Sequence, residues 1–277
     1  MTSITIKELQ SLEELKELAI LEEKVWGTPP LPTHQTLTVA KNGGIILGAY
    51  DNEKMVGFNY GFPGFSNQQV YLCSHMTGIH PDFQKKGIGF SLKKKQQTVA
   101  LDRGYNLITW TFDPLESLNA YLNLSKCRGI AADYTEHLYG DMDDALNGSL
   151  PSDRFRVEWR INSGHVNNDF TIEEKYAKDI PSLVNIKGNQ PLPCLDDVEN
   201  SMLESIEEKD TWLVPVPAKF QEIKKSDLDL ALDWRLKTRK IFKALLSKGF
   251  VGVQVIKHLD HQSIHHYIFV KKQLLDL

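Results

Sequence analysis

The sequence predicts a mixed α/β fold, with a sheet-and-helix domain followed by a smaller α/β region. Segments with helical periodicity alternate with short runs of β-branched and aromatic residues. Glycine and proline clusters separate these segments. The chain of 277 residues, 41% hydrophobic and 25% charged, has the composition of a globular protein with one large or two modest domains.

The first elements are a helix pair and a β-hairpin. Apolar residues at helical spacing predict a helix over residues 12–26, which the glycine and prolines of "GTPPLPT" end. Thr33 is expected to cap a second, short helix that runs toward Lys41. "GGIILGAYDNEKMVGFNYGF" then predicts a hairpin with an Asp-Asn turn, and residues 68–81 predict a further strand that ends at proline.

A glycine-containing turn leads into the next helix, predicted from Ile88 to about Arg103, with Gly104 as its C-terminal cap. "YNLITWTF" is almost entirely apolar, which favours a strand buried on both faces. A helix is predicted over residues 115–127, and "IAADYTEHLYG" and "FRVEWRI" predict two later strands. Because "NSGHVNND" is typical of a linker, we expect a first domain over residues 1–162 and a C-terminal α/β extension over 163–277.

The extension contains "TWLVPVPAKF", a long helix and the strands "FVGVQVIKHL" and "IHHYIFVKK". Ser226 and Asp229 form a capping-box pattern for the helix, which is expected to end at Lys248-Gly249. Its strand–Pro–Phe-Gln–helix–Gly–strand layout repeats that of residues 81–104. Two interpretations stay open: a chance similarity, or a degenerate internal duplication that kept the scaffold.

Composition narrows the classes of partner. The formal net charge of −4 argues against a general nucleic-acid binder, and no apolar run approaches the roughly 20 residues that cross a bilayer. The three cysteines are scattered, the N-terminus lacks signal-peptide features, and the histidines of "HLDHQSIHH" lack metal-ligand spacing. We therefore expect a cytoplasmic chain with no metal and with neither nucleic acid nor membrane as partner.

The stretch "IHPDFQKKGIGFSLKKKQQ" carries the main functional signal. A strand that enters a glycine turn and then a helix can bind an anion, because the first helical N–H groups have no intrahelical acceptor and the helix dipole favours negative charge. The spacing Gln84-x-x-Gly87-x-Gly89 fits neither a dinucleotide-binding turn nor a P-loop. It resembles the Q/R-x-x-G-x-G/A signature of the GNAT superfamily, the Gcn5-related N-acetyltransferases.

The resemblance covers roughly residues 1–162, and the whole chain is similar to a group of larger predicted acetyltransferases with a C-terminal extension. It implies acetyl-CoA as co-substrate and a small-molecule or peptide amine as acceptor, with no metal. The residues implied at the acetyl-CoA pyrophosphate are Gln84, Lys85, Lys86, Gly87, Ile88, Gly89 and Phe90.

Other residues are implied along the rest of acetyl-CoA. The backbone of Thr77, Gly78 and Ile79 would pair with the pantetheine arm, and a bulge near Gly78 would open the strand pair. Lys85, Lys86 or Lys93 would meet the 3′-phosphate, and Asn119 would lie near the pantetheine or the sulfur.

The segment expected to supply the catalytic acid departs from the family pattern N-x-x-A-x-x-x-Y, in which the tyrosine is the candidate acid. With Ala120 on the pattern's alanine, Leu124 stands at the tyrosine position and Ser117 at the asparagine position. Tyr121 is predicted three positions before Leu124 on the same helix face, and it is either the substitute acid or a packing residue. His75 is either a proton relay or a structural histidine.

These residues support an acetyl-CoA-dependent N-acyltransferase that acts by direct attack of an amine on the thioester. The alternative is a non-catalytic acyl-CoA-binding regulatory or interaction protein, since the family tyrosine is missing and the extension is large.

Overall fold

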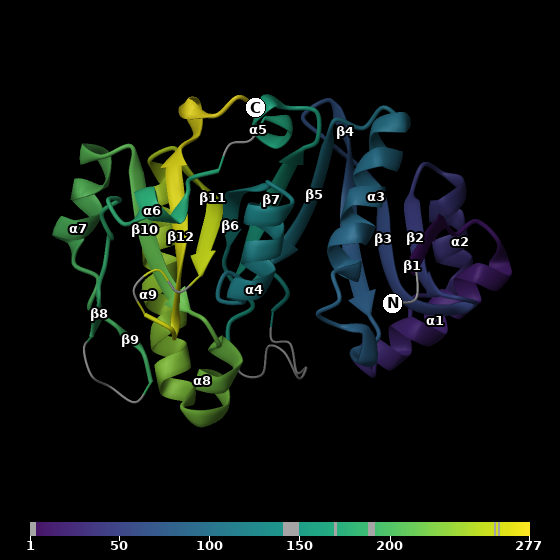
Figure 1. The fold of residues 1–277 in the computed structure, drawn as a ribbon, viewed down its shortest axis with the longest axis horizontal. Coiled ribbons are helices and arrows are strands. Elements are labelled where there is room, and N and C mark those ends of the chain that lie inside the picture. The colour runs from purple at the N-terminus through teal and green to yellow at the C-terminus, as the bar shows by residue number, and fades with distance from the viewer. Residues whose placement is uncertain (1–3, 141–149, 169–170, 188–191, 258, 260) are drawn as a thin grey trace. The chain divides into compact units, whose positions relative to one another are not determined.

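A computed structural model describes residues 4–140, 150–168, 171–187, 192–257, 259 and 261–277 (Figure 1). The chain forms two compact units: Met1–Trp110 with Arg160–Asn162, and Thr111–Trp159 with Ser163–Leu277. The sequence predicts that the first domain ends at residue 162, and this boundary stays a prediction. The compact units divide the chain at other positions.

The first unit is a mixed sheet with helices on both faces, which confirms the predicted fold class. Its strands are β1 (Ile4–Glu8), β2 (Ile45–Asp51), β3 (Lys54–Ser66), β4 (Gln69–Ile79) and β5 (Leu107–Phe112), the last continuing into the second unit. Its helices are α1 (Leu12–Trp26), α2 (Thr33–Lys41), the 3₁₀ helix η1 (Pro81–Phe83) and α3 (Ile88–Asp102). Strands β1 to β4 pair antiparallel in sequence order, whereas β5 pairs parallel with β4.

Side chains of β3 separate the two helical layers. Phe58 and Tyr60 belong to the core cluster formed with the α1 leucines Leu15, Leu18 and Leu21. The glycines on either side of these two residues face α3. A Cβ at Gly57 would lie 3.2 Å from Ile88, and one at Gly61 would lie 3.0 Å from Gln96. Helix α1 therefore covers one face of the sheet and α3 covers the other.

Local signals explain the helix ends of this unit. Ser11 caps α1 in a capping box with Glu14, and Gly27 ends the helix in the left-handed region. Helix α2 has the expected bounds, but the prediction that Thr33 caps it is wrong. Pro32 occupies the cap position and its carbonyl accepts the first helical N–H groups, so Thr33 is already helical. Strand β1 was not predicted.

The second unit is built on an antiparallel sheet. Its strands pair in the order β7–β6–β11–β12–β10. Their bounds are β6 (Ile130–Thr135), β7 (Arg154–Arg160, whose last residue belongs to the first unit), β10 (Thr211–Pro217), β11 (Phe250–Lys257) and β12 (Ile264–Lys271), with the short pair β8 (Ile186–Lys187) and β9 (Cys194–Leu195). Its helices are α4 (Ser117–Ala120), the π-helix η2 (Tyr121–Lys126), α5 (Gly164–Asn167), α6 (Glu174–Ala177), α7 (Asn200–Glu204), η3 (Ser205–Glu208), α8 (Phe220–Ser226), α9 (Leu228–Ser247) and η4 (Lys272–Leu274).

The long helix α9 starts one residue later than its capping pattern predicts. Ser226 is the last residue of α8, and the Asp227 carboxylate accepts the Leu230 N–H at 2.9 Å, so the predicted Ser226–Asp229 capping box is wrong. The two helical segments are thus joined by a single aspartate, which caps the second of them.

Helix α9 is tied to residues 111–159 by buried charges. Arg235, which is 2% exposed, donates to both oxygens of Asp113 at 2.8 and 2.5 Å. Arg239 donates to the fully buried Asp153 at 2.8 and 2.9 Å. These ion pairs join the C-terminal extension to the segment before it within one interior. Removing either partner of a pair would be costly, because it would leave a charge buried without its counter-charge.

The strand order bears on the suggested duplication. Strands β4 and β5 are direct neighbours, whereas β12 lies between β10 and β11. The two segments that share a sequence layout therefore pair their strands differently, which favours the chance interpretation. Among the described residues, none of the helices combines the length and the apolar character that a membrane span requires.

Candidate functional site

The turn before α3 exposes the N-terminal end of the helix. Lys85 and Gly87 have φ values of 62° and 81°, and Gly87 caps the helix with no side chain bonded to its end. The N–H groups of the first helical turn, from Ile88, therefore have no intrahelical acceptor. A Cβ at Gly87 or Gly89 would meet no atom within 4 Å, so no other part of the described chain packs against these two glycines.

Cationic side chains at the turn divide into exposed and buried ones. Lys85 and Lys86 are exposed, and the Lys86 ammonium lies 4.4 Å from the Phe83 ring centroid. Lys93 is only 4% exposed, so of the three lysines suggested for the 3′-phosphate, Lys85 and Lys86 are the accessible ones. The Gln84 side chain donates to the carbonyl of Ile79 at 3.5 Å, which ties the turn back to the end of β4.

Strand β4 leaves one edge open. It pairs with β5 at Leu72 and Cys73, and within the described residues no strand pairs with that edge from Ser74 to Ile79. On its other edge β4 stays paired with β3 up to Ile79. An open edge offers N–H and C=O groups to an extended ligand, as a strand would.

The bulge in β4 lies earlier than predicted. The register shifts between Tyr60 and Gly61, so His75 has no direct partner, whereas Gly78 pairs regularly with Phe58. A Cβ at Gly78 would lie 2.5 Å from the Phe58 ring, so this glycine permits close packing rather than a bulge. The prediction of a bulge near Gly78 is therefore wrong by three residues.

A buried polar network lies under the open part of β4. Ser74 Oγ donates to Gln96 Oε1 at 2.8 Å and accepts from Asn59 Nδ2 at 3.2 Å and from Lys93 Nζ at 2.8 Å. Asn59 also donates to Thr77 Oγ1 at 2.8 Å. Asn59 Oδ1 and Gln96 Nε2 are buried with no hydrogen-bond partner in the described structure.

Lys93 sits where β4 and β5 separate. Its ammonium lies 3.7 Å from the Trp110 ring centroid, while it donates to Ser74. Ser74 and Trp110 are the residues that follow the last paired positions, Cys73 and Thr109. A positive charge therefore lies at the apex of the gap between the strands, partly shielded from water, where charge–charge interactions are strengthened. Burial raises the pKa of the Cys73 thiol even though the Lys93 charge opposes it.

His75 faces a cavity of about 510 Å³ on the α1–α2 side of the first unit. Its ring centroid lies 6.3 Å from that of Tyr60 and 5.8 Å from that of Phe62, and although His75 is exposed, partial desolvation lowers its pKa from the ordinary value. The residues that line the cavity are Leu31, Gln35, Thr38, Val39, Asn42, Tyr60, Phe62, Pro63 and His75. His75 thus belongs both to the open stretch of β4 and to this cavity.

Asn119 and Tyr121 lie in the second unit. Asn119 is exposed on α4, and Tyr121 is the first residue of the π-helix, half-buried, with the Lys257 ammonium 3.6 Å from its ring centroid. The structure thus brings the turn, the β4 residues and His75 into one unit, and places these two candidates in the other.

The π-helix changes which residues share a face. A π-helical turn is wider than an α-helical one, so residues three apart no longer line up. Leu124 is 1% exposed whereas Tyr121 is half-buried, so the prediction that the two share a face is wrong. Ser117, at the family's asparagine position, is 3% exposed, donates to the Ala218 carbonyl and lies 3.0 Å from His265 Nδ1.

A comparison of the sequence with models of known protein families finds one matching family. The model of the acetyltransferase (GNAT) family matches residues 10–123. This stretch is a GNAT acetyltransferase region. The GNAT match runs through the α3 turn and the open edge of β4 and ends inside the π-helix, and a further C-terminal region follows it.

Solved GNAT structures align at low identity. The ribosomal-protein-S18-alanine N-acetyltransferase from Escherichia coli is 16% identical, with a TM-score of 0.45, over 57% of this chain and 94% of that one. Arabidopsis thaliana NAA60, solved with a bisubstrate analogue, is 12% identical, with a TM-score of 0.44, over 58% and 100%. The Salmonella typhimurium protein yncA, solved with acetyl-CoA, is 13% identical, with a TM-score of 0.46, over 57% and 94%. No curated protein matches the chain significantly.

GNAT enzymes use acetyl-CoA, and the residues of this chain fit it. The pyrophosphate needs N–H donors without intrahelical acceptors, which the turn at Gly87 and Gly89 provides. The pantetheine amides need an unpaired strand edge, which β4 provides after Cys73. Among the described residues no group of three or more His, Cys, Asp or Glu side chains could hold a metal ion.

Two features of the site were missed from the sequence. Lys93 stands in a run of three lysines, and only its position in the turn of α3 that faces β4 distinguishes it from its neighbours. Helical periodicity from Leu92 and Gln96 could have placed it near the buried face. The cavity at His75 depends on α2 and β3 packing together, and no local pattern signals it.

Proposed function

We propose that this chain is an acetyl-CoA-dependent N-acyltransferase that transfers an acetyl group to an amine by direct attack on the thioester. The observation that carries the proposal is the open edge of β4 leading into the uncapped N-terminus of α3, inside the GNAT region. The edge suits an extended amide-containing arm and the turn suits a diphosphate, in the order in which acetyl-CoA presents them.

We assign the co-substrate contacts to the sequence-predicted residues. The backbone N–H groups from Gln84 to Phe90 bind the pyrophosphate, and the edge at Thr77, Gly78 and Ile79 binds the pantetheine amides. Lys85 and Lys86 are exposed beside the turn and suit the 3′-phosphate. Asn119 remains a proposed contact from the second unit.

The reaction requires two proton transfers. The amine nitrogen forms a bond to the thioester carbonyl carbon, and the C–S bond then breaks, giving an amide and the CoA thiolate. The nitrogen loses a proton to a base, and the thiolate gains one to become CoA thiol, so no other reactant is needed. His75 is the proposed base, because its lowered pKa keeps it neutral at pH 7. Tyr121 stays the proposed acid.

Lys93 adds an electrostatic contribution to this scheme. Its ammonium lies at the apex of the β4–β5 gap and favours the negative charge that develops on the leaving sulfur. Replacing Lys93 by methionine keeps the length of the side chain and removes the charge. We expect kcat to fall about 100- to 1000-fold with little change in acetyl-CoA affinity, the range typical of removing one preorganised electrostatic donor. The matched control is Lys95→Met, which changes an exposed lysine two positions along the same helix.

The acceptor is proposed to enter the cavity at His75. Its lining is aromatic, apolar and neutral polar, with no acidic side chain among the described residues that form it. This suits a small amine that carries an apolar body and enters uncharged, rather than a polycation.

CoA-thiol release with a panel of amines tests the function. Arylalkyl amines should be acetylated faster than polyamines, and acetyl-CoA should bind without an acceptor. Binding of acetyl-CoA with no release for any amine would favour the non-catalytic acyl-CoA-binding alternative. Absence of binding would remove both functions.

A further inference from the structure

The second unit holds a pocket that the acetyl-transfer proposal does not use. Its volume is about 740 Å³, within the range typical of sites for small molecules. The floor is one face of the β10–β12 pair, where Pro215 lies opposite His266 and Pro217 lies opposite Ile264. The segment before β8 forms one wall, and Leu259 and His261 form another. The residues that line it are Lys178, Ile180, Ser182, Val184, Asn185, Ile186, Leu213, Pro215, Leu259, His261, Ile264 and His266.

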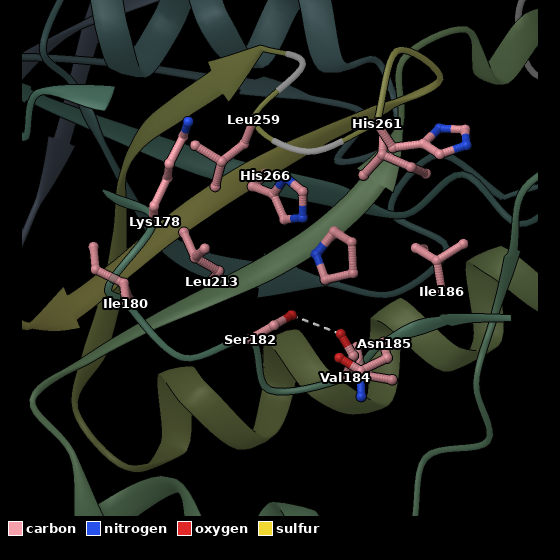
Figure 2. Close-up of a pocket in the computed structure, with 12 residues that line it drawn as sticks. Lys178, Ile180, Ser182, Val184, Asn185, Ile186, Leu213, Leu259, His261 and His266 are labelled. Atoms are coloured by element: carbon pink, nitrogen blue, oxygen red, sulfur yellow. Dashed lines mark hydrogen bonds between the residues drawn. The ribbon is translucent and has the colours of Figure 1, made fainter. Parts of the chain in front are cut away.

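The floor of the pocket is apolar and preformed. Leu213, Val184 and Ile264 are at most 4% exposed, so their positions are fixed by packing. The wall is held by a hydrogen bond from Ser182 Oγ to the Val184 carbonyl at 2.6 Å (Figure 2). A ligand with an apolar body would therefore meet a rigid surface and displace water from it.

The polar side chains among the described lining residues are basic or are hydrogen-bond donors. Figure 2 shows the His266 ring near the centre, between Lys178 on one side and His261 on the other. His266 is 5% exposed, whereas Lys178 and His261 are exposed at the rim. His261 Nδ1 accepts the Ser263 N–H at 3.1 Å, so in the neutral ring the proton is on Nε2, which can donate. The exposed amide of Asn185 adds a neutral donor at the rim.

Acidic side chains are absent from the twelve described residues of the lining. Among these described lining residues Lys178 carries the permanent charge, so the local field is positive and favours a negative ligand, and the two imidazoles add hydrogen-bond donors. A carboxylate accepts hydrogen bonds only, which matches donors from lysine, imidazole and a side-chain amide. The apolar floor selects against inorganic anions, which have no apolar surface to bury.

We propose that this pocket binds a small organic carboxylate with an apolar body, with the carboxylate toward Lys178 and His266 and the body over Leu213 and Ile264. The site is built entirely from the second unit, and it does not depend on the proposed acetyl transfer.

Ligand-observed NMR on the full chain tests the site with shape-matched probes. The probes are hexanoate and 4-phenylbutyrate, each compared with its neutral amide and with the corresponding amine. The carboxylates should bind at least about fivefold more tightly than the amides, because a hydrogen bond to an ionised acceptor is roughly twice as strong as a neutral one. Equal binding of acid and amide, or tighter binding of the amine, overturns the proposal.

Two further measurements locate the site. Lys178→Gln should weaken carboxylate binding about two- to fivefold, as expected for a partly exposed charge pair. The matched control is Lys175→Gln, three positions earlier, where the lysine pairs with Glu173 outside the pocket. The imidazole signals of His266 should shift on titration with hexanoate. Binding that leaves these signals and the Lys178→Gln affinity unchanged contradicts the assignment.

A peptide series distinguishes the source of the carboxylate. A hexapeptide with a free C-terminus is compared with its C-terminal amide. If only the free peptide binds, and neither small acid binds with a Kd of about 1 mM or tighter, the proposed ligand class is wrong.

Discussion

Two glycines at opposite ends of α3 allow the phosphate-binding turn to be tested with an internal control. Gly87 precedes the helix with a φ of 81°, and Gly104 follows it with a φ of 82°. A Cβ at either position meets no atom within 4 Å, so glutamate fits sterically at both. The backbone strain should be similar, about 1–2 kcal/mol in each variant. The added carboxylate differs in one respect: only at Gly87 does it stand before the open N–H groups of the helix.

The magnitude of the effect follows from ligand linkage. Acetyl-CoA at 100 times its Kd should stabilise the protein by about 2.7 kcal/mol. At 2–4 °C per kcal/mol, this corresponds to a rise in Tm of roughly 5–10 °C. Gly104→Glu should keep this rise, although its own Tm is lowered by strain and by a negative charge at the helix C-terminus. Gly87→Glu should lose it, since its carboxylate occupies and repels the diphosphate.

Differential scanning fluorimetry with and without acetyl-CoA measures these shifts. The comparison is between shifts within each variant, so the different starting stabilities cancel. An equal rise in both variants would show that the turn does not hold the diphosphate. An equal loss in both would show that strain in α3, rather than the turn, governs binding.

Three further predictions concern single side chains. Tyr121→Phe should lower kcat if the hydroxyl is the acid, and unchanged turnover across the pH range removes it from that role. For His75 the folded-state pKa lies below 6.5, so the folded protein binds fewer protons than the unfolded chain as pH falls through 6.5 toward that pKa, and stability decreases over this window. In His75→Gln, the urea midpoint should fall less between pH 7.5 and pH 5 than in the wild type. The decrease that remains is due to the other titrating groups. Asp153→Asn should cost up to about 3–5 kcal/mol in urea unfolding, because it removes the buried carboxylate that Arg239 contacts and leaves the arginine only its exposed partner Glu136. Glu136→Gln, which changes a more exposed partner of the same arginine, should cost less than about 1 kcal/mol and serves as the control.

The elements that the sequence predicts well are those with local signals. The helix over residues 12–26 has a capping box at one end and a left-handed glycine at the other, and its bounds are confirmed. The α3 turn is likewise encoded locally, because Gly87 must adopt a positive φ and the helix follows at once. Such features depend on only a few consecutive residues.

The features that the sequence does not reveal depend on distant partners. Lys93 is one of three consecutive lysines, and its burial depends on Trp110 from another strand. Gly78 pairs regularly with Phe58 and packs closely against its ring, a contact between two strands that no local pattern encodes, so the sequence does not show that the bulge lies at His75 instead. The π-helix at Tyr121 replaces a regular helix that periodicity alone predicts.

The ion pairs of Arg235 and Arg239 with Asp113 and Asp153 determine how the chain can be shortened. The aspartates lie N-terminal to residue 162 and the arginines lie C-terminal to it, yet they share one interior. A chain shortened after residue 162 would lose Arg239, the arginine that pairs with the buried Asp153, and would leave the partly buried Asp113 with only the longer contact to Arg154 at 3.8 Å. The C-terminal extension therefore stabilises residues 111–159, and a chain that ends at residue 162 should be insoluble.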